Sequence, residues 1–154
     1  MILRTATQDD IALLIKLRRD YFHLESIALF EQEQIDNDPQ LAHYFFEHLA
    51  DGSFVAMLAE KDGHIISAAF LVISERPRNA AFISGKVGIM LNVLTYAEYR
   101  RKGIAAKVIS ALIEEAKSAG VASIELAATT MARPLYEKLG FQLSPYTAMK
   151  LYLI

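Results

Sequence analysis

The sequence predicts a single α+β domain over residues 1–154, in which an antiparallel run of strands is followed by a strand–helix–strand unit. Three observations support this fold class. Short apolar stretches rich in β-branched residues and bounded by turn residues predict strands. Longer stretches with apolar residues three and four positions apart predict amphipathic helices. With 53% hydrophobic and 22% charged residues, the chain also has the composition of an ordinary globular domain.

The first third of the chain is expected to hold one strand and two helices. Residues 2–6 form a short strand by composition, and an acidic first turn then starts a helix over about residues 8–24. The following segment, residues 25–38, is rich in acidic side chains with few balancing cations. Pro39 suits a first helical position and opens a second helix, which Gly52 ends.

The middle of the chain predicts an antiparallel meander. A strand over residues 53–60 and its return over residues 65–74 are joined by an Asp-Gly turn, which is a strong hairpin signal. After a polar loop, residues 81–95 continue the meander. Gly85 and Gly88 within this stretch indicate a bulge or a close approach of a ligand to the backbone.

The last part of the chain predicts a crossover unit. A helix over residues 104–119 carries one apolar stripe and ends at Gly120, where glycine commonly caps a helix. The strand expected over residues 121–127 should lie parallel to the strand before that helix, with a right-handed crossover. A short helix over residues 131–139 and a last strand over residues 148–154 complete the domain.

The junction at residues 96–103 predicts an anion site. The first turn of the next helix has backbone N–H groups without intrahelical partners, and the helix dipole adds roughly +0.5 charge there. A pyrophosphate would fit this site, although the composition alone is equally consistent with a loop of solvated cations. Neither common glycine pattern for nucleotides is present. Three cationic residues precede the glycine that lets a ligand approach the backbone: Arg100, Arg101 and Lys102, followed by Gly103.

Two motifs stand about 30 residues apart in the second half of the chain. Residues 100–105 have the sequence RRKGIA, and residues 133–141 have the sequence RPLYEKLGF. The first resembles the R/Q-x-x-G-x-G/A signature of the GCN5-related N-acetyltransferase (GNAT) family, and the second closely matches that family's L-Y-E-K-x-G-F segment. Residues 91–100 resemble the family's fourth strand and the approach to the signature. The likeness covers residues 87–142 well.

The resemblance implies a fold and a co-substrate, acetyl-coenzyme A (acetyl-CoA). In this family a mixed, mostly antiparallel, twisted sheet has helices on both faces, and its central fourth and fifth strands splay apart. The pantetheine arm enters that gap, so the backbone of Val93, Leu94 and Thr95 would pair with it as another strand would. Backbone N–H groups of the next loop and helical turn would hold the pyrophosphate. The other expected cofactor-binding residues are Arg100, Arg101, Lys102, Gly103, Ile104, Ala105 and Ala106.

The implied reaction is direct attack of a primary amine on the thioester carbonyl in a ternary complex. Tyr136 matches the family's tyrosine that protonates the leaving thiolate. A phenol with a pKa of about 10 can protonate a thiolate whose thiol has a pKa of about 8.5, although the driving force for this proton transfer is small. Without the motif, Tyr136 would be a half-buried aromatic side chain. Thr129 stands where the family often has an asparagine that contacts the cofactor, so that contact is shortened or lost.

The general base has no motif. Glu125, within an otherwise apolar strand, is the carboxylate we select, although strand alternation could equally aim it at solvent. Glu25 and Glu31 are comparable choices, and a chain of water molecules could also remove the proton. Cysteine is absent and the four histidines lack the spacing of metal ligands, so we expect no metal.

The acceptor is expected to be a small molecule or a peptide that carries an amine. The acidic segment would attract a cationic acceptor, although a solvated helix surface explains it as well. A formal charge of −2 argues against nucleic acid, and no apolar run approaches the ~18 residues of a membrane span, so we expect a cytoplasmic protein. The apolar residues 151–154 lie either in the sheet or against a partner subunit, which makes a homodimer one reading.

The leading function is therefore an acetyl-CoA-dependent N-acyltransferase. A non-catalytic acyl-CoA-binding or regulatory module on the same fold is the alternative, because a fold does not fix an activity. Tyr136 favours the enzyme, whereas Thr129 and the unassigned base leave the module open as an alternative.

Overall fold

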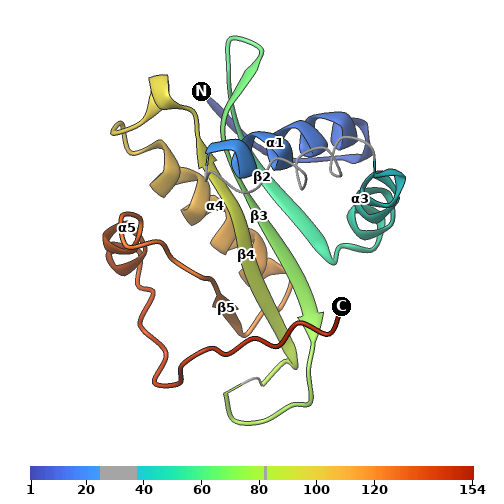
Figure 1. Cartoon of the computed structure of the whole chain (residues 1–154), viewed down its shortest axis with the longest axis vertical. Coiled ribbons are helices and arrows are strands. Elements are labelled where there is room, and N and C mark those ends of the chain that lie inside the picture. Colours follow the sequence, from blue (N-terminus) through green and yellow to red (C-terminus); the bar gives the residue numbers. More distant parts are fainter. Residues whose placement is uncertain (25–37, 82) are drawn as a thin grey trace.

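A five-stranded sheet forms the centre of the molecule (Figure 1). The computed structural model describes residues 1–24, 38–81 and 83–154. Within them the strands lie in sequence order, and every neighbouring pair is antiparallel except the last, which is parallel. The predicted meander and the predicted parallel return are both confirmed. The strands are β1 (Ile2–Thr5), β2 (Phe54–Lys61), β3 (His64–Glu75), β4 (Lys86–Thr95) and β5 (Ser123–Glu125).

Helices cover both faces of the sheet, as predicted. Successive side chains of a strand point to opposite faces, so the strands divide the core into two clusters. One cluster packs against α1 and α3 and includes Leu17, Phe45 and Phe70; the other packs against α4 and α5 and includes Leu71 and Leu112. The helices are α1 (Ile11–Leu24), α3 (Pro39–Asp51), α4 (Ile104–Ser118) and α5 (Arg133–Lys138), with short 3-10 turns η1 (Gln8–Asp10) and η2 (Ala97–Tyr99).

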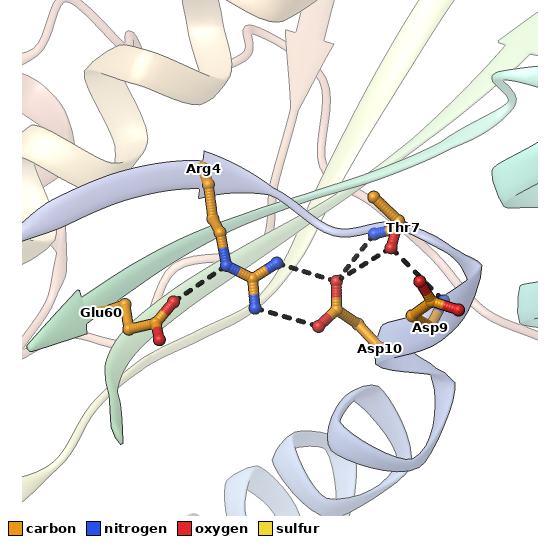
Figure 2. Close-up of polar contacts among 5 residues, drawn as sticks. All are labelled: Arg4, Thr7, Asp9, Asp10 and Glu60. Carbon is orange, nitrogen blue, oxygen red and sulfur yellow. Dashed lines mark hydrogen bonds and ion pairs between the residues drawn. The ribbon is translucent and has the colours of Figure 1, made fainter. Parts of the chain in front are cut away.

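An arginine on β1 holds the start of α1 against the sheet (Figure 2). Arg4 donates two hydrogen bonds to the Asp10 carboxylate, at 2.8 and 2.9 Å, and one to Glu60 of β2 at 2.9 Å. The same carboxylate accepts the backbone N–H of Thr7, whose hydroxyl oxygen caps the turn at Asp9. Hydrogen bonding from Arg4 holds the pKa of Asp10 below its usual value. These contacts fix where α1 begins and therefore where its later residues lie.

β4 contains a bulge at Asn92. Ala68 of β3 pairs with Leu94, but Phe70 pairs with Leu91, so β4 has one more residue than β3 in this interval. Asn92 has a left-handed backbone conformation with φ of 56°, which asparagine adopts more readily than most residues. As a result the adjacent side chains of Leu91 and Asn92 both lie on the face of the sheet covered by α1.

The glycines near β4 have a different role from the one the sequence suggested. Gly85 precedes β4 and has φ of 75° in the loop. Gly88 lies within the strand, where a Cβ atom would stand 2.8 Å from Cδ1 of Leu71. A side chain at Gly88 would therefore displace the end of Leu71, so this glycine fits close side-chain packing, and the bulge occurs further along the strand.

The end of the chain differs from the sequence prediction. The strand expected over residues 121–127 is limited to β5, and the strand predicted over residues 148–154 is wrong, because these residues form no strand. An apolar segment forms a strand only where a neighbouring edge accepts its backbone hydrogen bonds, and none of the described strands pairs with it. The exposed apolar and aromatic residues in this part are Leu143, Tyr146, Met149, Leu151, Tyr152, Leu153 and Ile154.

Candidate functional site

β4 and β5 separate soon after they pair. The parallel ladder joins residues 87–89 to residues 123–125. Beyond this ladder β4 continues to Thr95 with β3 on one side and none of the described strands on the other. The open edge presents backbone N–H and C=O groups to the gap between the strands. The predicted divergence of the fourth and fifth strands is therefore confirmed.

The three residues expected to pair with an extended cofactor arm lie along this edge. The Leu94 carbonyl accepts a hydrogen bond from the Ser67 hydroxyl at 2.9 Å, and the Thr95 carbonyl accepts one from Nε of Arg100 at 2.9 Å. Val93 comes just before them, and its side chain packs on the face covered by α4. Val93 therefore lies on the part of β4 that the parallel ladder with β5 does not reach.

The loop between β4 and α4 forms a cavity of about 210 Å³ at the start of α4. Gly103 precedes the first helical residue with φ of 75°, and Arg101 also has a positive φ, of 60°. A Cβ atom on Gly103 would meet no atom within 4 Å, so the space beside it is open. The N–H groups of the first helical turn have no intrahelical partners. The lining includes Arg100, Arg101, Gly103, Ile104, Ala105 and Ala106.

Cationic side chains gather at this cavity. Arg100, Arg101 and Lys102 are all exposed, and Nζ of Lys102 lies 5.7 Å from the centre of the Tyr99 ring. Their charges add to the positive end of the α4 dipole, and like charges repel one another. An anion bound at the start of α4 would relieve this repulsion and accept hydrogen bonds from the free backbone N–H groups of the first helical turn.

Tyr136 reaches the gap from α5. Its side chain is 7% exposed and packs edge-to-face on Phe141, with ring centroids 5.7 Å apart. It lines a small cavity at the gap together with Asn92 and Val93 of β4 and with Thr129. The structure therefore places a buried phenol where β4 and β5 diverge.

The sequence that builds this site matches one family model. The model of the Acetyltransferase (GNAT) family matches residues 14–141. The chain belongs to the GNAT acetyltransferase family. A search of curated proteins found no match.

Solved structures of GNAT proteins resemble this one. A protein of Clostridium acetobutylicum, described as a "predicted acetyltransferase" in a structure with acetyl-CoA, is 32% identical, with 99% of this chain and 96% of that chain covered and a TM-score of 0.87. Two others show the fold alone. A ribosomal-protein-alanine N-acetyltransferase of Brucella melitensis is 18% identical and has a TM-score of 0.70, with 99% of this chain and 100% of that chain covered. An aminoglycoside acetyltransferase from an uncultured soil metagenomic sample is 19% identical, covers 98% of each chain, and has a TM-score of 0.73.

Thr129 supports the start of α5 in this GNAT protein. Its hydroxyl oxygen accepts the backbone N–H of Ala132 at 3.2 Å, and its carbonyl accepts that of Arg133 at 3.0 Å. The side chain also lines the gap cavity with Tyr136. Thr129 therefore lies beside the gap, as the motif implies, but its hydroxyl oxygen already accepts a hydrogen bond in the turn before α5. Its contact with a cofactor stays a prediction.

Glu125 lies on β5 near the same tyrosine. Its carboxylate is about half-exposed and pairs with Nη1 of Arg76 at 3.2 Å. Glu125 and Tyr136 line one cavity of about 470 Å³ beside β5. The structure brings the two residues to one cavity, and the role of Glu125 as general base stays a prediction. Glu25 and Glu31, with the rest of the acidic segment before residue 38, lie outside the described residues.

Sequence reasoning missed two residues that line the gap, Asn92 and Tyr21, and the contact of Asn92 with Arg18. Asn92 is 1% exposed; its Nδ2 donates to the Leu17 carbonyl of α1 at 3.3 Å, and its Oδ1 accepts from Nη1 of Arg18 at 3.3 Å. Tyr21, one turn further along α1, lines the same gap cavity as Tyr136. The available signal was a lone amide within an apolar strand, since a buried amide requires hydrogen-bond partners.

Substitution of Gly103 by glutamate tests the anion site. A carboxylate there would repel a pyrophosphate and fill the space beside the helix start, so we expect the affinity for acetyl-CoA to fall at least about tenfold, or about 1.4 kcal/mol. Gly63→Glu is the matched control, because Gly63 has φ of 77° and equally open surroundings in the β2–β3 turn. Isothermal titration calorimetry compares the two variants. Equal affinities in both would contradict the assignment.

Proposed function

We propose that this GNAT protein is an N-acetyltransferase that moves an acetyl group from acetyl-CoA to a primary amine by direct attack in a ternary complex. The observation that carries the proposal is the open edge of β4, with a cationic helix start at one end and buried Tyr136 beside it. The similarity to the Clostridium acetobutylicum protein, whose structure contains acetyl-CoA, supports the choice of co-substrate.

In this proposal acetyl-CoA spans the loop and the gap. Backbone N–H groups of residues 101–106 bind the pyrophosphate, because they have no intrahelical partners and face the open side of Gly103. The pantetheine arm follows β4, where Val93 pairs with it through its backbone. The thioester then lies in the gap cavity that Tyr136 and Asn92 line.

The chemistry requires a stabilised oxyanion and two proton transfers. The amine nitrogen forms a bond to the thioester carbon, and a backbone N–H of β4 stabilises the negative charge on the carbonyl oxygen. The carbon–sulfur bond then breaks, and the thiolate takes a proton from the Tyr136 hydroxyl. The amine gives up its proton to a base, for which Glu125 or a water molecule is the proposed acceptor.

A non-catalytic acyl-CoA-binding module is the second candidate function. The contacts of Thr129 and Glu125 favour it, because Thr129 already accepts the N–H of Ala132 and Glu125 already forms an ion pair with Arg76. Such a module would bind acetyl-CoA at the same loop and show no turnover.

The acceptor in this proposal is a small molecule or a peptide amine, with neither nucleic acid nor membrane as a partner. The formal charge of −2 supports the exclusion of nucleic acid. None of the helices in the described ranges has the length and apolarity needed to cross a membrane. Among the described residues no three metal-ligating side chains lie together. The absence of a catalytic metal and the cytoplasmic location stay predictions.

Substitution of Tyr136 by phenylalanine separates the two functions. Loss of the hydroxyl removes the proton donor for the thiolate, so kcat should fall about 100-fold or more while acetyl-CoA affinity stays within about threefold. The measurement is release of free CoA thiol with a panel of amines. Tyr146→Phe is the control, since Tyr146 is 84% exposed in the C-terminal segment. Unchanged turnover in Tyr136→Phe would remove this residue from the mechanism, and binding without turnover in the wild type would favour the module.

We also propose that two copies of the chain associate through the C-terminal segment, residues 143–154. Its apolar side chains are strongly exposed, for example Met149 at 94% and Leu153 at 85%, and such a concentration of exposed apolar residues marks an interaction site. The same chain has a cavity of about 400 Å³ beside β5, with Ile113 and Val121 in its lining. The C-terminal segment of each copy would fill this cavity in the other copy. The segment and the apolar part of the cavity would then both be covered.

The double variant Leu151→Lys/Leu153→Lys tests this association. Charged side chains at these exposed positions leave the monomer's fold intact but oppose burial in an interface, so a dimer should become a monomer. Analytical ultracentrifugation measures the mass, with circular dichroism as the check on folding. Phe46→Lys on α3, where Phe46 is 54% exposed, is the control and should stay dimeric. A monomeric wild type would contradict the proposal.

A further inference from the structure

Arg18 on α1 is a half-buried cation without a carboxylate partner among the described residues. Its Nη1 donates to Oδ1 of Asn92 at 3.3 Å, and its guanidinium carbon lies 4.5 Å from the centre of the Phe22 ring. Burial lowers the pKa of Arg18, yet an arginine keeps its proton in proteins. Among the described residues, one amide and one aromatic ring therefore hold this charge partly out of water, and no carboxylate contacts it.

Four other arginines have carboxylate partners among the described residues, whereas the exposed loop arginines have none there. Arg4 contacts both Asp10 and Glu60, and the other pairs join arginines and carboxylates at 2.6 to 3.6 Å. Removing a charge from water is unfavourable unless an opposite charge or several hydrogen bonds replace the water. The described residues around Arg18 provide no such replacement, so the arrangement suits a negatively charged group that arrives with a ligand. The remaining pairs are Arg19–Asp20, Arg76–Glu125 and Arg133–Glu137.

The surroundings of Arg18 indicate what else that ligand carries. Arg18 lines a cavity of about 260 Å³ on the face of the sheet covered by α1 and α3. Apart from Arg18 and the Tyr44 hydroxyl, the lining side chains are apolar, and they include Phe54, Phe70 and Leu91. A pocket with one cation and several aromatic rings suits a molecule that has both an anionic group and an apolar side chain.

The bulge in β4 connects this cavity to the gap between β4 and β5. Leu91 belongs to the lining of both the Arg18 cavity and the gap cavity. Asn92, the next residue, lines the gap cavity and accepts the hydrogen bond from Arg18. Because the left-handed backbone at Asn92 puts both side chains on the α1 face, a ligand group at Arg18 lies one residue away from the gap where the thioester is proposed.

We propose that Arg18 binds a carboxylate of the acceptor, and that the acceptor is an amine that also carries a carboxylate and an apolar side chain, as apolar α-amino acids do. This inference rests on the proposed function. The guanidinium presents parallel N–H donors that match a carboxylate, the aromatic cavity takes the apolar side chain, and the amine points to the gap. Asn92 acts as a positioning residue that holds the guanidinium at the bulge. The acceptor class therefore differs from the cationic amines that the acidic segment suggested.

The test compares apolar α-amino acids with their carboxamides, which have the same side chain and amine but no negative charge. With acetyl-CoA as donor, kcat/KM of the wild type should be about 100-fold higher for the acids than for the amides. Arg18→Gln should lower kcat/KM for the acids about 100-fold and leave the amides within about threefold. Arg18→Lys keeps the charge but loses the paired donors, so it should fall between the two.

Arg19→Gln is the matched control, because Arg19 is the next residue on α1 and its partner is Asp20 on the same helix. Arg19→Gln also removes one positive charge from α1, and its kcat/KM for the acids and for the amides should equal the wild-type values. Circular dichroism and acetyl-CoA affinity establish that each variant is folded. Equal use of acids and amides by the wild type would overturn the inference, and so would an equal loss of both substrates in Arg18→Gln.

A binding experiment separates this inference from the proposed function. Thermal unfolding with the amino acids, in the presence of CoA, should show stabilisation of the wild type and of Arg19→Gln but not of Arg18→Gln. If this pattern appears without acetyl transfer, the proposed function fails and the carboxylate site stands. If acetyl transfer occurs with no preference for acids, the carboxylate site fails and the proposed function stands.

Discussion

The divergence of β4 from β5 is the constraint on which the rest of the site depends. Only three residue pairs join the two strands before they separate, and β4 then runs on beside β3 with an open edge. The bulge at Asn92 lies on that open part of β4 and turns two adjacent side chains towards α1. Asn92 itself is held by the backbone of α1 and by Arg18, so the bulge and the helix support each other.

Electrostatics divides the site into two halves. On the α4 side, the loop cations and the helix dipole provide a positive, exposed surface around Gly103, where backbone N–H groups remain for an anion. On the α1 side, one half-buried arginine lies among aromatic side chains. The buried side chain of Tyr136 lies at the gap between these halves. Each half suits a different anionic ligand, a pyrophosphate in the first and a carboxylate in the second.

The features that could be predicted from the sequence are those set by local pattern. The Asp-Gly hairpin, the amphipathic helices and the parallel return after α4 follow from residue spacing. The family motifs predict two further features, the loop before Gly103 and the position of Tyr136. The bulge at Asn92 and the role of Arg18 depend on contacts between residues about 75 positions apart, which no local pattern reveals. The prediction of a last strand over residues 148–154 was wrong for a related reason, because apolarity predicts a strand but says nothing about whether a neighbouring strand edge is available.

Hydrogen–deuterium exchange with and without saturating acetyl-CoA reports where the cofactor binds, because it follows backbone N–H groups along the chain. We expect slower exchange in two separate segments, residues 101–106 at the start of α4 and the backbone around Val93 on β4, with no change in α3. Slower exchange elsewhere with no change in either segment would contradict the placement of the cofactor and the reaction derived from it.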